Sequence, residues 1–299
     1  MHLLKRSRAV TGACAAIALA ATLSACTTNE ETGNPEGWED IKPAVVPEVQ
    51  ALVPADIQKR GTISMGTNPP FAPMEFKDSN GTIIGIDVDL ARAAAATMGL
   101  ELVVQEQDFS LILPSISAGT VDFGAAGFTD NEERRKNYDF VNYLSAGLQW
   151  AQQTGENVDP DNACGLTVAV QKGTVSESDD VAVRSEECVK QGKPAITMLS
   201  YESSDQAFTA LVLGRADAVS ADSPVTAYAV TRADGKIEKA GRIYEAADYG
   251  WPVPKDSELG PALKAALQHL IDTGDYAKTL QPWGVTEGLK PQATINGEE

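Results

Sequence analysis

The most constraining feature of this sequence is a pattern that occurs once in each half of the chain. The segments ILPSISAGTVDFGAAG and AFTALVLGRADAVSAD share an Ala/Leu-rich run, a glycine, two further residues, an aspartate and a run of small residues. Each segment predicts a helix that stops at the glycine and is followed by a strand: Leu111–Ala118 with Val121–Ala126, and Gln206–Leu213 with Ala216–Ser220. Because the unit occurs only twice, it favours two similar α/β halves over a solenoid. A chance recurrence of common helix–strand units is the alternative.

The stretch Val121–Phe140 places polar groups directly beyond the first predicted strand. The strand breaks at Gly127, and Thr129 and Arg134 lie five residues apart before and within a charged helix start. A hydroxyl, a guanidinium and free N–H groups at a helix start can together hold a carboxylate. The second predicted strand leads to Asp222, and ligands of open α/β sheets bind at the carboxyl ends of strands. Taken alone, the first segment also fits a surface helix with a solvated arginine.

Length and charge limit the class of protein. The chain has 299 residues, which allows two domains with separate cores. Its formal net charge of −18 repels phosphate backbones, so we expect no nucleic-acid partner. The 43% hydrophobic and 22% charged composition is ordinary for a globular protein.

The N-terminus reads as an export signal. A basic start precedes the apolar run Ala9–Leu23, which is shorter than the roughly 20 residues of a membrane span. The run ends in Leu-Ser-Ala-Cys at Cys26, which resembles a lipobox, so residues 1–26 are interpreted as a lipoprotein signal peptide. We expect Cys26 to be lipidated and the protein to lie outside the cytoplasm, anchored to the cell membrane. An ordinary signal peptide with an incidental Cys26 is the alternative, and residues 27–55 are expected to form a tether and an N-terminal extension.

Two cysteines remain after the signal cysteine and Cys26 are set aside. In an oxidising compartment Cys164 and Cys188 are candidates for a disulfide, which would stabilise the fold by about 3 kcal/mol. Two buried free thiols are the alternative. A structural zinc site is not expected, and Asp87 and Asp89 are interpreted as acids of a helix start rather than metal ligands.

Several blocks in one order give the chain a family resemblance. They are TNPPFAPMEF, GIDVDLARAAA, QDFSLILPSISAGTVD, AAGFTDNEERRKNYDF, VAVQKGT, GRADAVSADSP and YGWPVPKDSELGPALKAALQHLIDTGDYAKTLQPWG, from about Gly61 to Trp283. Each block is a weak signal, but their number, order and spacing resemble an amino-acid-binding protein of a bacterial ABC importer (solute-binding protein family 3). The resemblance implies an α/β fold of periplasmic-binding-protein type II, with two Rossmann-like lobes, two hinge strands and a ligand cleft between the lobes. The first lobe would comprise residues 56–148 and 249–290, the second 149–248, and residues 291–299 would be a tail.

The resemblance also assigns roles at the two ends of an amino acid. Thr129 and Arg134 match the hydroxyl and guanidinium that hold the α-carboxylate. Asp222 matches the carboxylate from the other lobe that takes the α-ammonium, and Gly127 matches a position whose carbonyl also faces that ammonium. Thr174 lies in the loop that closes onto the carboxylate.

Further positions concern the ligand side chain. Phe71 and Phe109 match the aromatic residues that flank it. At Asn68, Gln171 and Ala221 the chain lacks the charged groups that some relatives use there, which argues against a strongly cationic ligand.

The family implies a monomeric, cofactor-free receptor that captures a polar amino acid and delivers it to permease and ATPase subunits. The main rival is an enzyme like the cyclohexadienyl or arogenate dehydratases, with Glu75, Asp108 or Asp222 as general acid or base. The sequence argues against it because His2 lies in the signal and His269 on a helix that is expected to be packed. An adhesive surface lipoprotein is a further alternative.

Overall fold

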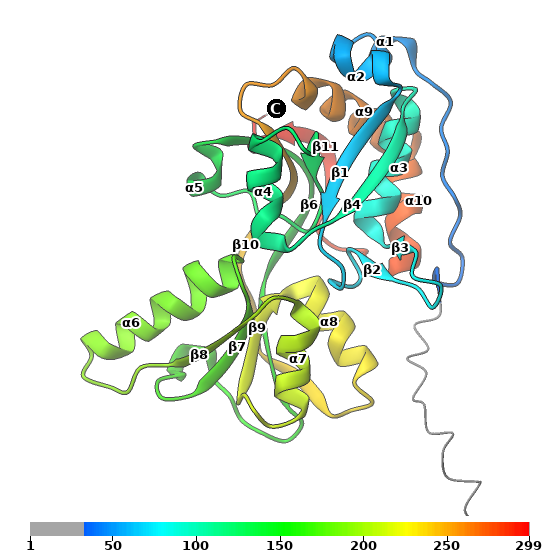
Figure 1. The fold of residues 1–299 in the computed structure, drawn as a ribbon. Helices are drawn as coiled ribbons and strands as arrows, with labels where there is room; N and C mark the ends of the chain where they lie inside the picture. Colours follow the sequence, from blue (N-terminus) through cyan, green and yellow to red (C-terminus); the bar gives the residue numbers. More distant parts are fainter. Residues whose placement is uncertain (1–32, 299) are drawn as a thin grey trace, which may run out of the picture.

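Two lobes joined by two long strands make up the computed structural model, which describes residues 33–298 (Figure 1). The expected signal peptide, Cys26 and the first residues of the expected tether lie outside the described residues. Within residues 33–298, no helix combines the length and the hydropathy that a membrane crossing requires.

The first lobe combines segments from both ends of the described chain (Figure 1). Its three-stranded sheet has the order β4-β1-β5, in which β1 (Thr62–Thr67) runs parallel to β4 (Glu101–Glu106) and β5 (Phe123–Gly124). The Asn80-Gly81 turn joins the hairpin of β2 (Phe76–Lys77) and β3 (Ile83–Ile84), as such a dipeptide predicts. The helices of this lobe are α1 (Pro47–Gln50), α2 (Ala55–Arg60), α3 (Ile86–Thr97), α4 (Phe109–Ser117), α5 (Glu132–Arg135), α9 (Leu259–Thr273), α10 (Asp275–Leu280) and the 3-10 turn η3 (Gln281–Trp283).

Two antiparallel strands connect the lobes, namely β6 (Tyr138–Gln153) and β10 (Ile237–Pro254). They pair from Tyr138 with Pro254 to Gln153 with Ile237, with register shifts around Tyr244 and Tyr249. Bulges bend a strand locally and interrupt its ladder. The long strands therefore provide the two predicted crossings between the lobes.

The second lobe is formed by the chain between β6 and β10. Its strands continue the sheet of β6 and β10 in the order β10-β6-β9-β7-β8, where β7 (Thr167–Gln171) is parallel to β8 (Thr197–Tyr201) and to β9 (Ala218–Asp222). The lobe also contains η1 (Pro160–Asn162), the π-helix η2 (Ser176–Val181), α6 (Ala182–Lys190), α7 (Ser204–Val212) and α8 (Ser223–Arg232).

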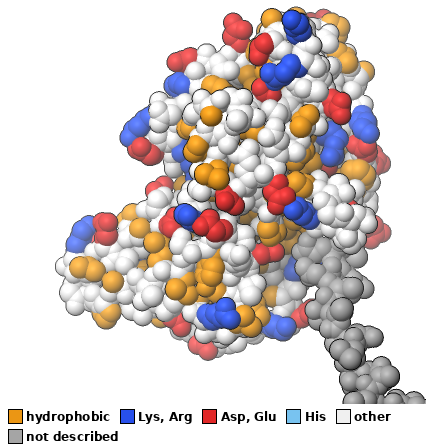
Figure 2. Space-filling view, viewed as in Figure 1, with side chains coloured by type: hydrophobic (Ala, Val, Ile, Leu, Met, Phe, Trp, Pro, Cys, Tyr) orange, Lys and Arg blue, Asp and Glu red, His pale blue; other side chains and the backbone are white. Residues whose placement is uncertain are grey.

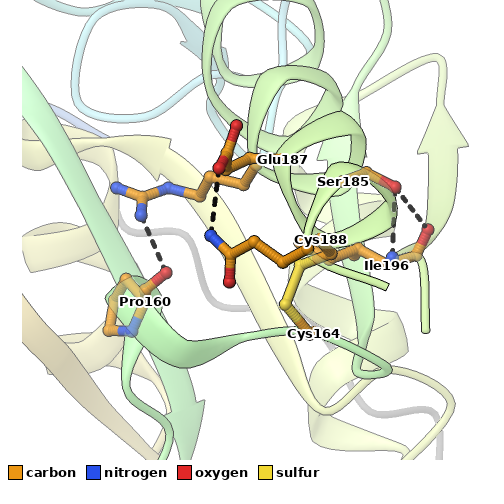
Figure 3. The surroundings of a disulfide bond; sticks show 8 residues. Pro160, Cys164, Ser185, Glu187, Cys188 and Ile196 are labelled. Carbon is orange, nitrogen blue, oxygen red and sulfur yellow. Dashed lines mark hydrogen bonds between the residues drawn. A yellow bond between two sulfur atoms is a disulfide. The ribbon is translucent and has the colours of Figure 1, made fainter. Parts of the chain in front are cut away.

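A disulfide joins Cys164 to Cys188, which confirms the predicted pair (Figure 3). It ties α6 to the segment before β7. The Ser185 hydroxyl ties the same helix to Ile196, since it accepts from the Ile196 N–H at 3.1 Å. The disulfide thus links α6 covalently to the rest of the second lobe.

Both predicted helix–strand units are present, as α4 with β5 and as α7 with β9. Each strand is parallel to the first strand of its lobe, β5 to β1 and β9 to β7. The expectation of two similar α/β halves is therefore confirmed.

The C-terminal segment differs from expectation. Residues 291–299 were predicted to be a tail, but Leu289–Ile295 forms β11, which pairs with β6. Ala293 and Thr294 are buried, whereas Pro291 is exposed. The segment is ordered because it covers an edge of β6, where proline is tolerated.

Candidate ligand-binding cleft

A cavity of about 270 Å³ lies where the lobes meet the crossing strands. Thr129 and Asn131 line it from the first lobe, and Val175, Asp179 and Asp222 line it from the second. Figure 2 shows acidic and basic side chains meeting where the two lobes face each other. The cavity thus brings together groups that are far apart in the sequence.

Arg134 reaches across from the first lobe to the second. It lies on α5, whose N-cap Asn131 accepts the Arg134 N–H at 2.9 Å. Its Nη1 donates to the Thr129 carbonyl at 2.8 Å, and its Nη2 donates to the Gly173 carbonyl at 3.2 Å. The guanidinium is therefore held at the rim of the cleft by backbone oxygens of both lobes.

Two aromatic rings support the same guanidinium. Phe109 and Phe128 stack with their centroids 4.5 Å apart. The Arg134 guanidinium carbon lies 5.8 Å from the first centroid and 5.5 Å from the second, within the range of cation–π attraction. Burial lowers the pKa of Arg134, and the nearby Asp222 carboxylate opposes that shift. A ligand carboxylate could accept from the remaining N–H groups of the guanidinium and balance its charge.

Asp222 supplies the opposite charge from the second lobe. It ends β9, precedes α8 and is 8% exposed. Burial raises its pKa to about 6, while Tyr249 and Arg134 oppose the rise. Asp222 lines the cavity, and the Arg134 guanidinium lies close enough for the two charges to interact.

Asn68 and Gln171 meet at the buried end of the cleft. Gln171 Nε2 donates to Asn68 Oδ1 at 2.7 Å, and Asn68 Nδ2 donates to the Gln107 carbonyl at 2.8 Å. The side-chain oxygens of Thr67, Gln107 and Gln171 are buried, and none has a hydrogen-bond partner within residues 33–298. Gln171 also lines the narrow cavity beside Phe71 and Asp222, so its unpaired oxygen is available to accept an N–H donor of a ligand.

Phe71 contributes to the floor of the cleft. It is 6% exposed and packs so closely against Gly127 that a Cβ there would lie 2.7 Å from its ring and 3.3 Å from that of Tyr249. Gly127 also has a φ of +56°, which favours glycine. Phe109 has Phe128 as its stacking partner rather than Phe71.

Thr174 lies in the loop after β7. Its hydroxyl donates to the Gln171 carbonyl at 2.7 Å, so the side chain fixes the loop itself. A narrow cavity of about 10 Å³ separates this loop from Phe71 and Asp222. The two lobes are therefore close together around the predicted site.

Asp180 anchors the π-helix that follows this loop. The residue is 2% exposed, and its carboxylate accepts four hydrogen bonds of 2.6 to 2.8 Å from Trp150, Ser220, Tyr244 and Arg184. Three of these donors lie on β6, β9 and β10. The position of the Thr174 loop is thus coupled to both crossing strands.

The structure adds cleft residues that were not predicted. Phe128 supports Arg134, Tyr249 lies beside Gly127 and Asp222, and Gln107 contacts Asn68. Phe128 and Tyr249 belong to the blocks AAGF and YGW, but neither carries a pattern that separates a cleft aromatic from a core aromatic. Among residues 33–298 there is no group of three metal-ligating side chains.

Comparisons with known proteins show the family of the chain. The model of the bacterial extracellular solute-binding proteins, family 3, matches residues 63–286. The arginine-binding protein ArgT of Corynebacterium glutamicum is 58% identical over 97% of this chain and 96% of its own length. The arginine-binding extracellular protein ArtP of Bacillus subtilis is 28% identical over 73% of this chain and 84% of its own length.

A solved structure extends the likeness to the fold. An ancestral arginine-binding protein bound to arginine aligns with a TM-score of 0.69 and 31% identity, over 75% of this chain and 98% of that chain. The relatives are named as binding proteins, which supports solute binding over the dehydratase alternative. The chain belongs to family 3 of the bacterial extracellular solute-binding proteins and has their periplasmic-binding-protein type II fold.

Proposed function

We propose that this protein captures a cationic amino acid, with arginine as the first candidate, and delivers it to the permease of an ABC importer. The observation that carries the proposal is the placement of Arg134 and Asp222, which come from different lobes and lie close enough at the cleft to shift each other's pKa. A zwitterion needs a cation for its carboxylate and an anion for its ammonium, and both must be partly removed from water. The two residues meet that need together only when the lobes are closed.

We assign the α-carboxylate and the α-ammonium of the ligand to the middle of the cleft. Arg134 and Thr129 hold the carboxylate, and the loop of Thr174 closes over it. Asp222 and the Gly127 carbonyl hold the ammonium. The positions of these groups support the assignment, because Arg134 donates to two backbone carbonyls and has further N–H groups that a ligand carboxylate could accept.

The ligand side chain is assigned to the end of the cleft between Phe71 and Phe109. A guanidinium carries five N–H donors and needs acceptors around it. Asn68 and Gln171 supply amide oxygens there, and the Gln171 oxygen is buried without a donor among residues 33–298. Asn68, Gln171 and Ala221 carry no charge, which argues against a cationic ligand from the sequence alone, but neutral amide oxygens can also accept from a guanidinium. The relatives ArgT and ArtP are both named as arginine-binding proteins, which also favours arginine as the ligand.

Delivery follows from closure. A ligand that binds both lobes favours the closed state by its differential affinity for that state. A permease that distinguishes closed from open lobes then receives loaded protein. We further propose that Cys26 carries a lipid anchor outside the cytoplasm, which the lipobox-like sequence and the extracellular family support.

A thermal-shift screen of the protein amino acids tests the proposal. A ligand at one hundred times its Kd stabilises the native state by about 2.7 kcal/mol, so arginine is expected to raise Tm clearly. Agmatine, which lacks the carboxylate, serves as the control and should produce little shift. If no amino acid raises Tm and calorimetry detects no binding, the proposed function is wrong.

A further inference from the structure

A group of buried oxygens below the cleft floor has no role in the binding scheme above. The side chains of Glu75, Asp87, Tyr143 and Tyr249 are at most 1% exposed. Both Glu75 carboxyl oxygens, Asp87 Oδ1 and the two phenol oxygens have no partner with good hydrogen-bond geometry within residues 33–298, although Glu75, Asp87 and Tyr143 lie close enough to shift one another's pKa. Unpaired buried polar atoms are rare in native proteins and call for an explanation.

Close backbone packing brings the two carboxyl groups together. Gly85 adopts a φ of +130°, and a Cβ at this position would lie 2.3 Å from the Met74 carbonyl oxygen and 2.9 Å from the Glu75 Cα. The Asp87 N–H donates to the Met74 carbonyl at 2.9 Å. The start of α3 therefore lies directly against the backbone of Glu75.

Both residues of the pair contact predicted ligand-binding residues, Asp87 through its carboxyl group and Glu75 through its backbone carbonyl. Asp87 Oδ2 accepts the Gly127 N–H at 2.8 Å, and the Phe71 N–H donates to the Glu75 carbonyl at 2.7 Å. Gly127 and Phe71 form the floor of the cleft. The carboxyl pair thus lies one layer below the place assigned to the ligand ammonium.

Burial makes a doubly ionised pair unfavourable. It raises the pKa of Glu75 well above its ordinary value, and the neighbouring Asp87 raises it further. Burial also raises the pKa of Asp87, which Tyr143, the Gly127 N–H and Glu75 oppose. Two adjacent buried carboxyl groups therefore retain at least one proton near neutral pH.

The other titratable groups around the pair do not neutralise it. Tyr143 on β6 and Tyr249 on β10 have raised pKa values and stay uncharged. Asp222 lies beyond Tyr249 and adds further negative charge, and Arg134 lies beyond Asp222. Within residues 33–298, neither carboxyl of the pair forms a salt bridge.

We propose that Glu75 and Asp87 provide a second negative charge for the ligand ammonium and that ligand binding releases a proton from this pair to solvent. The inference rests on the proposed function. A bound cation favours the ionised form of a nearby carboxyl, and by linkage the ionised form binds the cation more tightly. Arginine affinity should therefore rise with pH across the range in which the pair loses its first proton.

Calorimetry of arginine binding tests this in phosphate and in Tris, whose ionisation enthalpies differ. The apparent binding enthalpy of the wild-type protein should depend on the buffer near pH 7, in the sense of proton release. Asp87→Asn keeps an acceptor for the Gly127 N–H but cannot ionise. It should bind arginine about tenfold more weakly at pH 8 and lose the buffer dependence. Asp272→Asn, an equal change of charge at an exposed position of α9, is the control and should match the wild type.

The outcomes separate the two proposals. If the wild type binds no amino acid, the proposed function fails. If it binds arginine without proton release near pH 7, the proposal that Glu75 and Asp87 lose a proton on binding is wrong, whatever affinity the Asp87→Asn variant shows. If a folded Asp87→Asn protein keeps both the wild-type affinity and the proton release, the released proton comes from another group and the inference is overturned.

Discussion

Gln171 and Asn68 are hydrogen-bonded directly across the cleft, with 2.7 Å between Nε2 and Oδ1. Both residues are buried, at 5% and 6% exposure. Arg134 adds a second contact between the lobes through the Gly173 carbonyl. The closed arrangement is thus supported by contacts of the protein itself, so the protein and the ligand both contribute to the free energy of closure.

Removal of this contact should weaken ligand binding. In Gln171→Leu, closure would bury Asn68 Oδ1 without its donor, which costs about 1–3 kcal/mol. Since the ligand binds the closed state, Kd should rise about 5- to 150-fold. Calorimetry measures the change, and Gln191→Leu at the exposed end of α6 is the matched control. An unchanged Kd in a folded Gln171→Leu protein would show that the contact plays no part in closure.

Arg134→Ala should abolish measurable binding. The ligand carboxylate would be buried without its cation, at a cost of about 2–5 kcal/mol. The melting curve of the free protein should change little, because the carbonyls that Arg134 contacts lie at the rim of the cleft. Lys136→Ala, two residues along the chain and exposed, should bind normally. Near-normal affinity of Arg134→Ala would contradict the carboxylate assignment.

Ligand affinity should fall in acid. The pKa of Asp222 is raised to about 6 in the free protein, so its carboxyl becomes neutral as pH drops below that value and no longer attracts the ammonium. Kd should rise by up to about tenfold per pH unit below pH 6. Titrations between about pH 4.5 and pH 6.5 measure this, and Asp222→Asn should bind weakly with a flatter profile.

The Asp222 carboxyl has the opposite pH effect on the stability of the free protein: it weakens ligand binding in acid but stabilises the fold there. A carboxyl whose native pKa is raised stabilises the fold at low pH, and this contribution is lost as pH rises through about 6. Asp222→Asn should therefore raise Tm relative to the wild type at pH 7 more than at pH 4. Equal shifts at both values would mean that the pKa of Asp222 is not raised.

The disulfide should matter for stability and little for binding. Cys164 and Cys188 close a loop of 24 residues in sequence separation, for which the chain-entropy relation gives about 3 kcal/mol. Denaturant unfolding of the Cys164→Ser/Cys188→Ser double variant should show this loss. Arginine affinity at a temperature where the variant is folded should remain, because neither cysteine lines the cleft. A loss of affinity would instead imply that α6 controls the Thr174 loop.

Patterns local to the chain predicted the two similar α/β halves. The family resemblance implied the two-lobed fold, and Arg134 and Asp222 remain the predicted charged ends of the site. Arg134 and Asp222 follow strands in two similar units, and the edge rule for α/β sheets then places them together. The carboxyl pair was not predicted, because Asp87 looks like an ordinary acid of a helix start. Only the close packing at Gly85 shows that it lies against Glu75.

Two other features, β11 and the side-chain end of the cleft, also differ from the sequence-based expectation because they depend on tertiary contacts. The segment of β11 contains Lys290 and Pro291 and has no alternating pattern, so its order depends on pairing with β6. The side-chain end of the cleft was interpreted from charge alone. The unpaired amide oxygens at Gln107 and Gln171 depend on rotamers that a sequence does not specify.

The crossing strands also define how this protein can be divided. The chain enters the second lobe along β6 and returns along β10, where Leu148 and Tyr244 are paired neighbours. The second lobe is thus an internal insertion with adjacent ends, the arrangement in which domain transplantation succeeds. A single cassette exchange between relatives would replace the Asp222 half of the receptor while the Arg134 half stays intact, which makes such chimaeras a direct route to altered selectivity.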